Sequence, residues 1–235
     1  MGRQTEHFTV FIQSGAVIAV LAVFKDRVLE LFETKKEKET QDYLLKLGSS
    51  FMLTAIGGLT LKNAGWELPE EAAPIAWALV IGGILFILVE RGKEEKEEAL
   101  THQVPQITWI LAIAFGMAQL VAMIFPGASR SGTTIIIGII LGMRRGEAVE
   151  YSFLLGVPTL LAAGAYQLVS AITEDRQAVM VEAPMLALGT VVSGITAFFA
   201  VKWLLTYLQK NTFIYFGWYR VVLGVLVLLF FTKGG

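Results

Sequence analysis

Long apolar segments separated by short charged ones constrain this chain more than any other feature of its sequence. A helix that crosses the roughly 30 Å hydrocarbon core of a bilayer needs about 20 mostly apolar residues. Segments close to that length occupy residues 8–24, 43–61, 74–90, 107–125, 147–170, 184–207 and 213–231. The pattern predicts an all-α fold made of membrane helices, because a helix pairs all of its backbone polar groups within the segment.

The composition supports a membrane environment and excludes several classes of function. Hydrophobic residues make up 55% of the chain and charged residues 17%, with a mean hydropathy of +0.63. A soluble core cannot bury so much apolar surface. The net charge of -1 supplies no field that would attract nucleic acid, and the absence of cysteine excludes disulfides and thiolate chemistry.

An eighth apolar stretch, residues 133–143, is too short to cross a membrane alone. Pro126 and Gly127 interrupt the chain just before it. Residues 107–143 are therefore expected to form a re-entrant hairpin of two half-helices that meet at an irregular turn. Irregular backbone at membrane depth is tolerated only where protein or a watery cavity surrounds it.

The positions of Lys and Arg predict the topology, because cytoplasmic loops are enriched in them. If the hairpin returns to its starting side, thirteen of these residues fall on one side of the membrane and four on the other, with Arg130 and Arg220 inside it. We therefore expect six transmembrane helices plus the hairpin in a multi-pass protein of the inner (plasma) membrane, with the N-terminus outside. A hairpin that crossed fully and returned would give the same count.

A faint internal repeat suggests two inverted halves. Trp77 and Gly83 have the same spacing as Trp218 and Gly224. The expected organisation is one membrane domain, residues 1–235, with a first repeat over 8–91 and a second over 107–231 that includes the hairpin 107–143. Inverted repeats usually place the binding site between them, near the midplane. The first repeat has no hairpin, so a segment ahead of residue 8 is expected to be missing.

Arg130 is the residue that most strongly suggests chemistry. It lies within the hairpin, where an unpaired guanidinium costs several kcal/mol, so an anion nearby is the natural explanation. The residues around it are hydroxyl-bearing side chains and glycines that admit close approach: Gly127, Ser129, Ser131, Gly132 and Thr134. The second half-helix, expected to begin near Ser131, would direct N–H groups at the same point, and a guanidinium fork suits phosphate oxygens. The alternative is a Pro-Gly turn whose hydroxyls only cap a helix.

Metal ligands are scarce in the sequence. His7 precedes the first apolar segment and His102 lies in a charged loop, so both are expected to be solvated. Glu90, Glu147 and Glu150 lie at the ends of apolar segments. These carboxylates are poor candidates for holding a divalent cation at the midplane.

The segment 125–134, Phe-Pro-Gly-Ala-Ser-Arg-Ser-Gly-Thr-Thr, resembles a signature of the undecaprenyl-diphosphate phosphatases, the bacitracin-resistance proteins. The resemblance continues in residues 8–16 and 150–158 and covers essentially the whole chain. It implies that Ser129, Arg130 and Thr134 are catalytic residues that bind a diphosphate. The remaining expected substrate contacts are Gln13, Gln119, Gly127, Ser131, Gly132 and Arg220.

The resemblance also implies an activity: hydrolysis of a polyprenyl diphosphate to the monophosphate and inorganic phosphate, which recycles the lipid carrier of cell-wall synthesis. Its expected partners are that lipid and the surrounding membrane lipids, with a homodimer left open. A divalent cation, Mg²⁺ or Ca²⁺, is implied as cofactor. Its ligands and the nucleophile are expected on the segment missing ahead of residue 8, so this chain is expected to be truncated and catalytically impaired.

Two other functions fit the sequence. A lipid flippase or transporter would share inverted repeats and broken helices. A non-catalytic membrane scaffold would fit the scarcity of carboxylates but would leave Arg130 and its hydroxyl neighbours unexplained.

Overall fold

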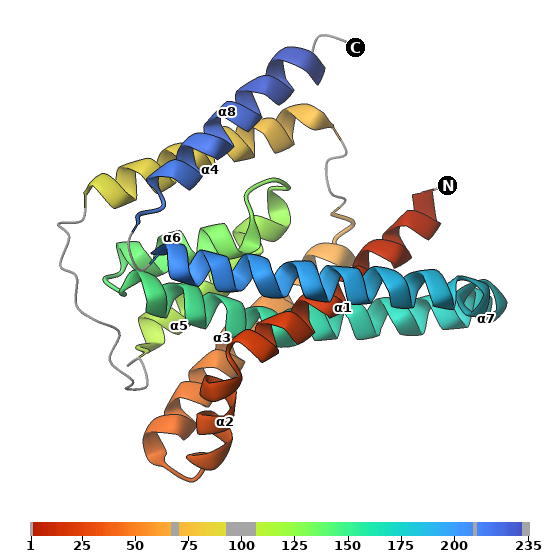
Figure 1. Ribbon diagram of the computed structural model, residues 1–235, viewed down its shortest axis with the longest axis horizontal. Helices are drawn as coiled ribbons and strands as arrows, with labels where there is room; N and C mark the ends of the chain where they lie inside the picture. Colours follow the sequence, from red (N-terminus) through yellow and green to blue (C-terminus); the bar gives the residue numbers. More distant parts are fainter. Residues whose placement is uncertain (1, 67–70, 93–106, 209–210, 232–235) are drawn as a thin grey trace. The chain divides into compact units, whose positions relative to one another are not determined.

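The computed structural model describes residues 2–66, 71–92, 107–208 and 211–231, and every regular element in these ranges is an α-helix. Figure 1 shows their arrangement along the chain. The helices are α1 (Gly2–Val23), α2 (Lys25–Glu33), α3 (Lys38–Asn63), α4 (Ala72–Arg91), α5 (Trp109–Ile124), α6 (Arg130–Ile140), α7 (Arg145–Leu208) and α8 (Ile214–Phe231). The predicted all-α fold is confirmed.

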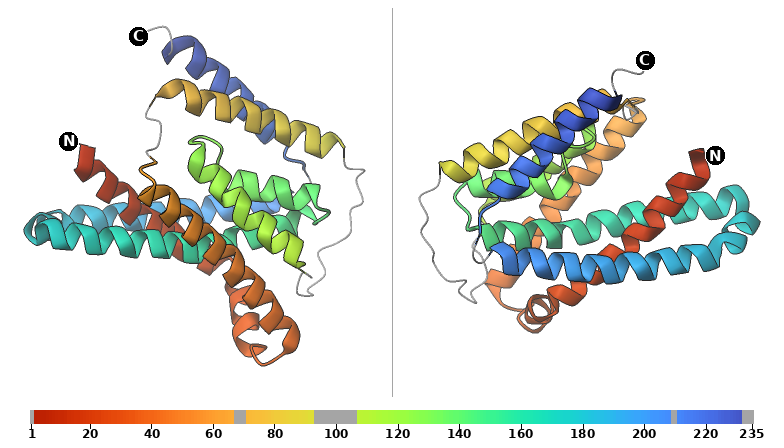
Figure 2. Two further views of the ribbon diagram at one scale, coloured as in Figure 1. Left: turned by 180° about the vertical axis from the view of Figure 1, so that it is seen from behind. Right: turned by 45° about the horizontal axis from the view of Figure 1, so that its top comes forward.

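Two helices differ from the sequence prediction. The amphipathic α2 occupies a segment that carried no predicted element. The expected spans 147–170 and 184–207 belong to the single helix α7, which contains Pro184. The residues between them are mostly good helix formers, so the backbone stays helical where a loop was expected. This helix turns back on itself, and 153–166 and 183–207 lie side by side in Figures 1 and 2.

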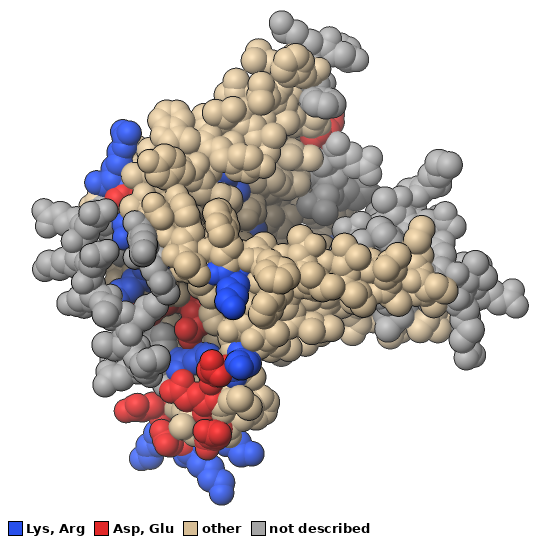
Figure 3. Space-filling model, in the orientation of Figure 1, with Lys and Arg blue, Asp and Glu red and all other residues tan. Residues whose placement is uncertain are grey.

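In the part of the chain that the structure describes, four helical segments are long and apolar enough to cross a membrane: α3, α4, Arg145–Tyr166 and Ala183–Leu208. Shorter apolar helices cover Gln13–Val23, α5, α6 and Ile214–Phe230. Large apolar side chains are exposed on most helices, as expected of surfaces that face lipid. Figure 3 shows charged side chains gathered around α2. The chain is a membrane protein, and the count of six spans stays a prediction.

The chain divides into two compact units. The first combines Met1–Lys36 with Phe153–Tyr207, and Val20, Phe24, Leu154 and Val201 form its buried cluster. Here α1 lies against α7 at Gly15, where an added Cβ would come within 2.1 Å of the Thr190 carbonyl oxygen. The second unit contains Glu37–Ser152 and Leu208–Gly235, and it includes the predicted hairpin. The proposed repeat boundaries, 8–91 and 107–231, stay a prediction.

Glycines bring α4 and α8 together in the second unit. An added Cβ at Gly83 would lie 2.6 Å from the carbonyl oxygen of Gly217, and one at Gly224 would lie 2.7 Å from that of Ala76. Residue numbers rise along α4 as they fall along α8, so the two helices are antiparallel, as Figures 1 and 2 also show. Small residues permit such close backbone approach in membrane helices. Gly83 and Gly224, the glycines of the faint repeat, both lie in this interface.

Buried polar contacts fix the other helices of the second unit. Ser50 and Thr54 of α3 donate to the carbonyl oxygens of Ala112 and Gly116 in α5, at 2.7 and 3.2 Å. At the end of α4, the carboxylate of Glu90 is fully buried and accepts from the guanidinium of Arg145 at 2.7 Å. The two α3 hydroxyls thus hold α5 in place through its carbonyl oxygens, and these polar groups stay buried between the helices.

Close packing of α4 and α8 predicts that a methyl group at Gly217 destabilises the protein. The new Cβ would lie 2.7 Å from Cγ1 of Ile87 and 2.8 Å from the carbonyl oxygen of Gly83. Overpacking of this kind costs about 1–3 kcal/mol, so Gly217→Ala should lower the thermal unfolding temperature in detergent. Gly48→Ala is the control, because nothing lies within 4 Å of its added Cβ. Equal unfolding temperatures for both variants would contradict the interface.

Candidate functional site

The predicted hairpin is formed by α5 and α6, which run back alongside each other in Figures 1 and 2. Helix α5 ends at Ile124, and Pro126 follows in the turn. Gly127 has φ +90° and Ser129 has φ +68°, and α6 begins at Arg130. A positive φ is unusual for serine and costs of the order of 1–3 kcal/mol. Strain of this kind at a turn persists only where the surroundings stabilise it.

Ser129 caps the first turn of α6. Its Oγ accepts from the backbone N–H of Gly132 at 3.2 Å, and its carbonyl oxygen accepts from the N–H of Thr133 at 2.9 Å. Helix α6 thus begins one residue ahead of the predicted start near Ser131. The first N–H groups of a helix have no partner within the helix and carry the positive end of its dipole. The start of α6 is therefore suited to an anion.

Arg220 of α8 binds the carbonyl side of the same turn. Its Nη2 donates to the carbonyl oxygens of Gly127 at 2.9 Å and Ala128 at 3.1 Å. A longer contact of 3.4 Å reaches the carbonyl oxygen of Ala78 in α4. Arg220 is only 3% exposed, and Gly82 leaves room for it, since an added Cβ there would lie 2.6 Å from Nη2. Arg220 was predicted to contact substrate, whereas these contacts are with the backbone of the turn.

The glycines of the turn are needed for packing as well as for conformation. A Cβ at Gly127 would lie 2.6 Å from the carbonyl oxygen of Ile75 in α4, and its positive φ also disfavours a side chain. A Cβ at Gly132 would lie 3.1 Å from Oγ of Ser129 and 3.4 Å from Cε2 of Phe86. Both glycines therefore let the turn lie directly against its neighbours.

Two threonines stabilise the start of α6 from within. Oγ1 of Thr133 lies 2.9 Å from the carbonyl oxygen of Arg130 and 3.1 Å from that of Ala118, so it links α6 to α5. Thr134 is fully buried, and its Oγ1 lies 3.0 Å from the carbonyl oxygens of Arg130 and Ser131. Thr134 was predicted to bind the diphosphate. Its hydroxyl lies among backbone groups of the first turn, and its binding role stays a prediction.

The structure brings most of the predicted site residues together in the second unit. Ser129, Arg130, Ser131, Gly132 and Thr134 form the N-cap and first turns of α6, with Arg130 half-buried. Gln119 is 2% exposed and follows Ala118, which contacts Thr133. Gln13 lies on α1 in the first unit, and its side chain is exposed. The binding roles of these residues stay predictions.

The acidic residues at the ends of apolar segments do not form a metal site. Glu90 binds Arg145, and Glu147 accepts from Nε of Arg144 at 2.9 Å. Within the ranges that the structure describes, no three His, Asp or Glu side chains gather to hold a metal ion. His102 lies outside the described residues. The described residues do not fit the expected divalent cation.

Sequence reasoning missed two contributors to the turn. Ser152 of α7 is 3% exposed, and its hydroxyl hydrogen-bonds with that of Thr134. Gly82 makes room for Arg220. Neither contact has a local sequence signal, because the partners are 18 and 138 residues apart along the chain.

Fold and site together define an α-helical membrane protein with a polar turn in a helical hairpin. Residues 1–226 match the family described as bacitracin resistance protein BacA. Over all 235 residues the chain is 44% identical to a Rhizobium etli protein named undecaprenyl-diphosphatase, 86% of which is covered. A Xanthomonas oryzae pv. oryzae protein of the same name is 40% identical over 97% of this chain and 84% of its own length. The chain belongs to the bacitracin resistance protein BacA family.

Displacing Arg220 tests whether it holds the turn. In Gly82→Ala the new Cβ would lie 2.6 Å from Nη2, the movable end of a flexible side chain, so the guanidinium should leave the carbonyls of Gly127 and Ala128. Amide hydrogen exchange at residues 127–130 should then accelerate by roughly 10-fold. Gly92→Ala on the same helix is the control, because its nearest contact is 3.5 Å. Unchanged exchange in Gly82→Ala would show that the turn does not need Arg220.

Proposed function

We propose that this protein hydrolyses undecaprenyl diphosphate, or a similar polyprenyl diphosphate, to the lipid monophosphate and inorganic phosphate. The observation that carries the proposal is the division of polar groups at the hairpin turn. The carbonyl oxygens of Gly127 and Ala128 accept from Arg220, while α6 begins beside them with Arg130. In the proposed complex, phosphate oxygens bind at the N-terminus of α6, beside the guanidinium of Arg130. The name of the two relatives, undecaprenyl-diphosphatase, supports this ligand.

Arg130 and the first N–H groups of α6 stabilise negative charge in the proposed reaction. A phosphoryl group in transfer carries charge on its equatorial oxygens, and donors fixed beforehand stabilise that charge without reorganising. The guanidinium of Arg130 offers two parallel donors to phosphate oxygens. Ser129 accepts the N–H of Gly132 at its Oγ and retains its own hydroxyl proton for a phosphate oxygen.

The bond changes of the reaction are those of a phosphoric anhydride hydrolysis. The oxygen of a water molecule attacks the terminal phosphorus, the bridging P–O bond breaks, and the lipid monophosphate leaves with the bridging oxygen. The hairpin contributes stabilisation of charge and placement of the diphosphate. We assign no base or nucleophile to it.

The lipid chain would lie along the apolar exterior of the protein. Exposed side chains continue the hairpin arm α5 away from the turn: Ile110 is 71% exposed, Ile113 52% and Met117 50%. A prenyl chain on such a face stays in contact with hydrocarbon while its diphosphate reaches the turn. In this proposal the protein lies in the plasma membrane, and the distribution of Lys and Arg predicts that the side rich in them faces the cytoplasm.

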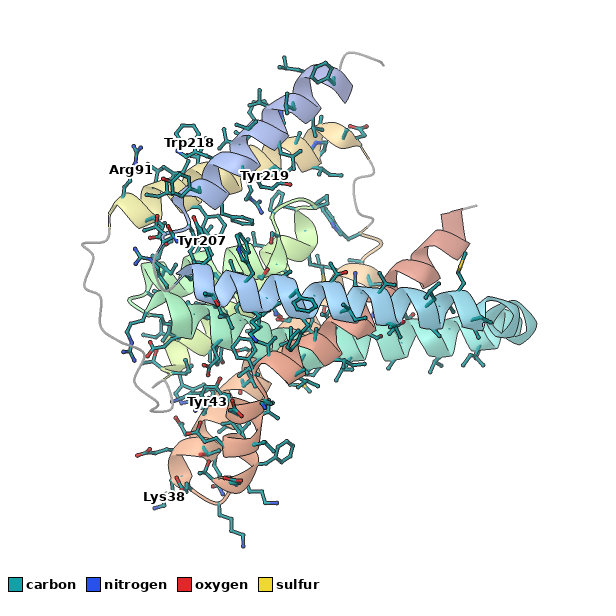
Figure 4. All side chains as sticks on the ribbon, in the orientation of Figure 1. Lys38, Tyr43, Arg91, Tyr207, Trp218 and Tyr219 are labelled. Carbon is teal, nitrogen blue, oxygen red and sulfur yellow. The ribbon has the colours of Figure 1, made fainter. Side chains whose placement is uncertain are left out.

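Removing the guanidinium of Arg130 tests the proposed reaction. Arg130→Ala should lower kcat/KM for farnesyl diphosphate, measured as phosphate release in detergent, by about 10²–10³-fold, the usual loss on removing a charge-stabilising donor. Arg130→Lys should retain part of the activity, since it keeps the charge and loses the planar fork. Arg91→Ala, an exposed arginine at the end of α4 (Figure 4), is the matched control and should remain active.

Two outcomes would count against the proposal. Equal phosphate release by the Arg130→Ala and Arg91→Ala variants would separate the hairpin from hydrolysis. The other outcome concerns transport. If the unmodified protein translocates polyprenyl phosphate in reconstituted vesicles, the Arg130→Ala variant does not, and neither protein hydrolyses the diphosphate, the protein is a lipid transporter instead.

A further inference from the structure

A pair of buried hydroxyls lies behind the phosphate-binding turn, on two different helices. Thr134 of α6 is fully buried, Ser152 of α7 is 3% exposed, and their hydroxyls are hydrogen-bonded to each other. Both belong to the second unit. Two hydroxyls share two protons, so the acceptors around the pair determine which group donates to which.

The surrounding carbonyl oxygens determine the direction of this hydrogen bond. Oγ1 of Thr134 has the carbonyl oxygens of Arg130 and Ser131 at 3.0 Å each. The carbonyl oxygen available to Ser152, that of Ser131, lies at 3.5 Å, which is too long for a good O–H···O bond. The best arrangement has Thr134 donating to the first turn of α6 and Ser152 donating to Thr134.

This direction of donation has a consequence for Thr134. Its only proton is used on a carbonyl of the turn, and its side chain has no exposed surface. Thr134 therefore supports the phosphate site through the backbone of Arg130 and Ser131. A chain of hydrogen bonds also polarises its members, so a donor at Ser152 strengthens the bond that Thr134 makes.

We infer that Ser152 is a positioning residue for the phosphate-binding turn. It donates to Thr134, which in turn holds the carbonyls of Arg130 and Ser131, so that the N–H groups and the Arg130 side chain at the start of α6 keep one orientation. The inference rests on the proposed function, because it assigns Ser152 a role in the same site.

A double-mutant cycle on farnesyl diphosphate hydrolysis tests this inference. Ser152→Ala should lower kcat/KM by roughly 10-fold, chiefly through kcat, because a misoriented donor set loses contacts formed in the transition state. Thr134→Val should lower it further. The double variant should be no worse than Thr134→Val alone, because groups that act as one chain are not additive. Thr134→Ser keeps the hydroxyl and should restore activity to within about 3-fold of the unmodified protein.

Matched variants separate positioning from a general loss of stability. Ser50→Ala and Thr54→Val remove equally buried hydroxyls that donate to carbonyls of α5. They should lower the unfolding temperature about as much as Ser152→Ala and Thr134→Val do. Their kcat/KM should stay within about 3-fold of that of the unmodified protein. If Ser152→Ala and Ser50→Ala lower kcat/KM equally, or if the losses of Ser152→Ala and Thr134→Val multiply in the double variant, the inference is wrong.

Amide hydrogen exchange decides the inference independently of catalysis. Exchange at residues 130–134 should be roughly 10-fold faster in Ser152→Ala than in the unmodified protein, and unchanged in Ser50→Ala. An unmodified protein that releases no phosphate would count against the proposed function, while faster exchange in Ser152→Ala alone would still support the positioning role. Identical exchange in all three proteins would overturn it.

Discussion

The rest of the structure depends on how the hairpin turn satisfies its backbone polar groups. An apolar environment supplies no water, so each carbonyl and N–H at the turn needs a partner from protein or ligand. Arg220 reaches from α8 to the carbonyl oxygens of Gly127 and Ala128. Ser129 accepts from the N–H of Gly132. The guanidinium of Arg220 therefore lies on the side of the turn where its carbonyl oxygens point. The N-terminus of α6 lies on the other side, and the positive end of its dipole suits a phosphate group.

Packing around the turn makes this arrangement possible. Gly83, Gly217 and Gly224 allow α4 and α8 to approach closely, and the same pairing places Arg220 opposite Gly82. Hydroxyls of α3 hold α5, the first arm of the hairpin, through its carbonyl oxygens. Beside the unusual φ of Ser129, the contacts of Arg220 with Gly127 and Ala128 hold the turn. A membrane protein with no polar solvent inside relies on such contacts instead of hydration.

Hydropathy predicted most of the helices, and the break at Pro126 and Gly127 added the hairpin, because these are local properties of the sequence. It could not predict the continuous α7, since helix formers replaced the expected loop, or α2, whose charged residues resembled a solvated connection. The motif around Arg130 predicted which residues lie at the turn. The role of Arg220 depends on carbonyl oxygens about 90 residues away along the chain, and the orientation of Thr134 depends in part on Ser152 of α7. Gln13 was grouped with the site through resemblance alone, and it lies in the other compact unit.

The most direct test of the account is an experimental structure of the protein bound to a non-hydrolysable prenyl diphosphonate. We predict that phosphonate oxygens lie within hydrogen-bonding distance of the Arg130 guanidinium and of the first N–H groups of α6, with Arg220 still on the carbonyl oxygens of Gly127 and Ala128. A diphosphonate bound elsewhere, for example beside Arg145 and Glu90, with no density at the hairpin turn, would contradict the account.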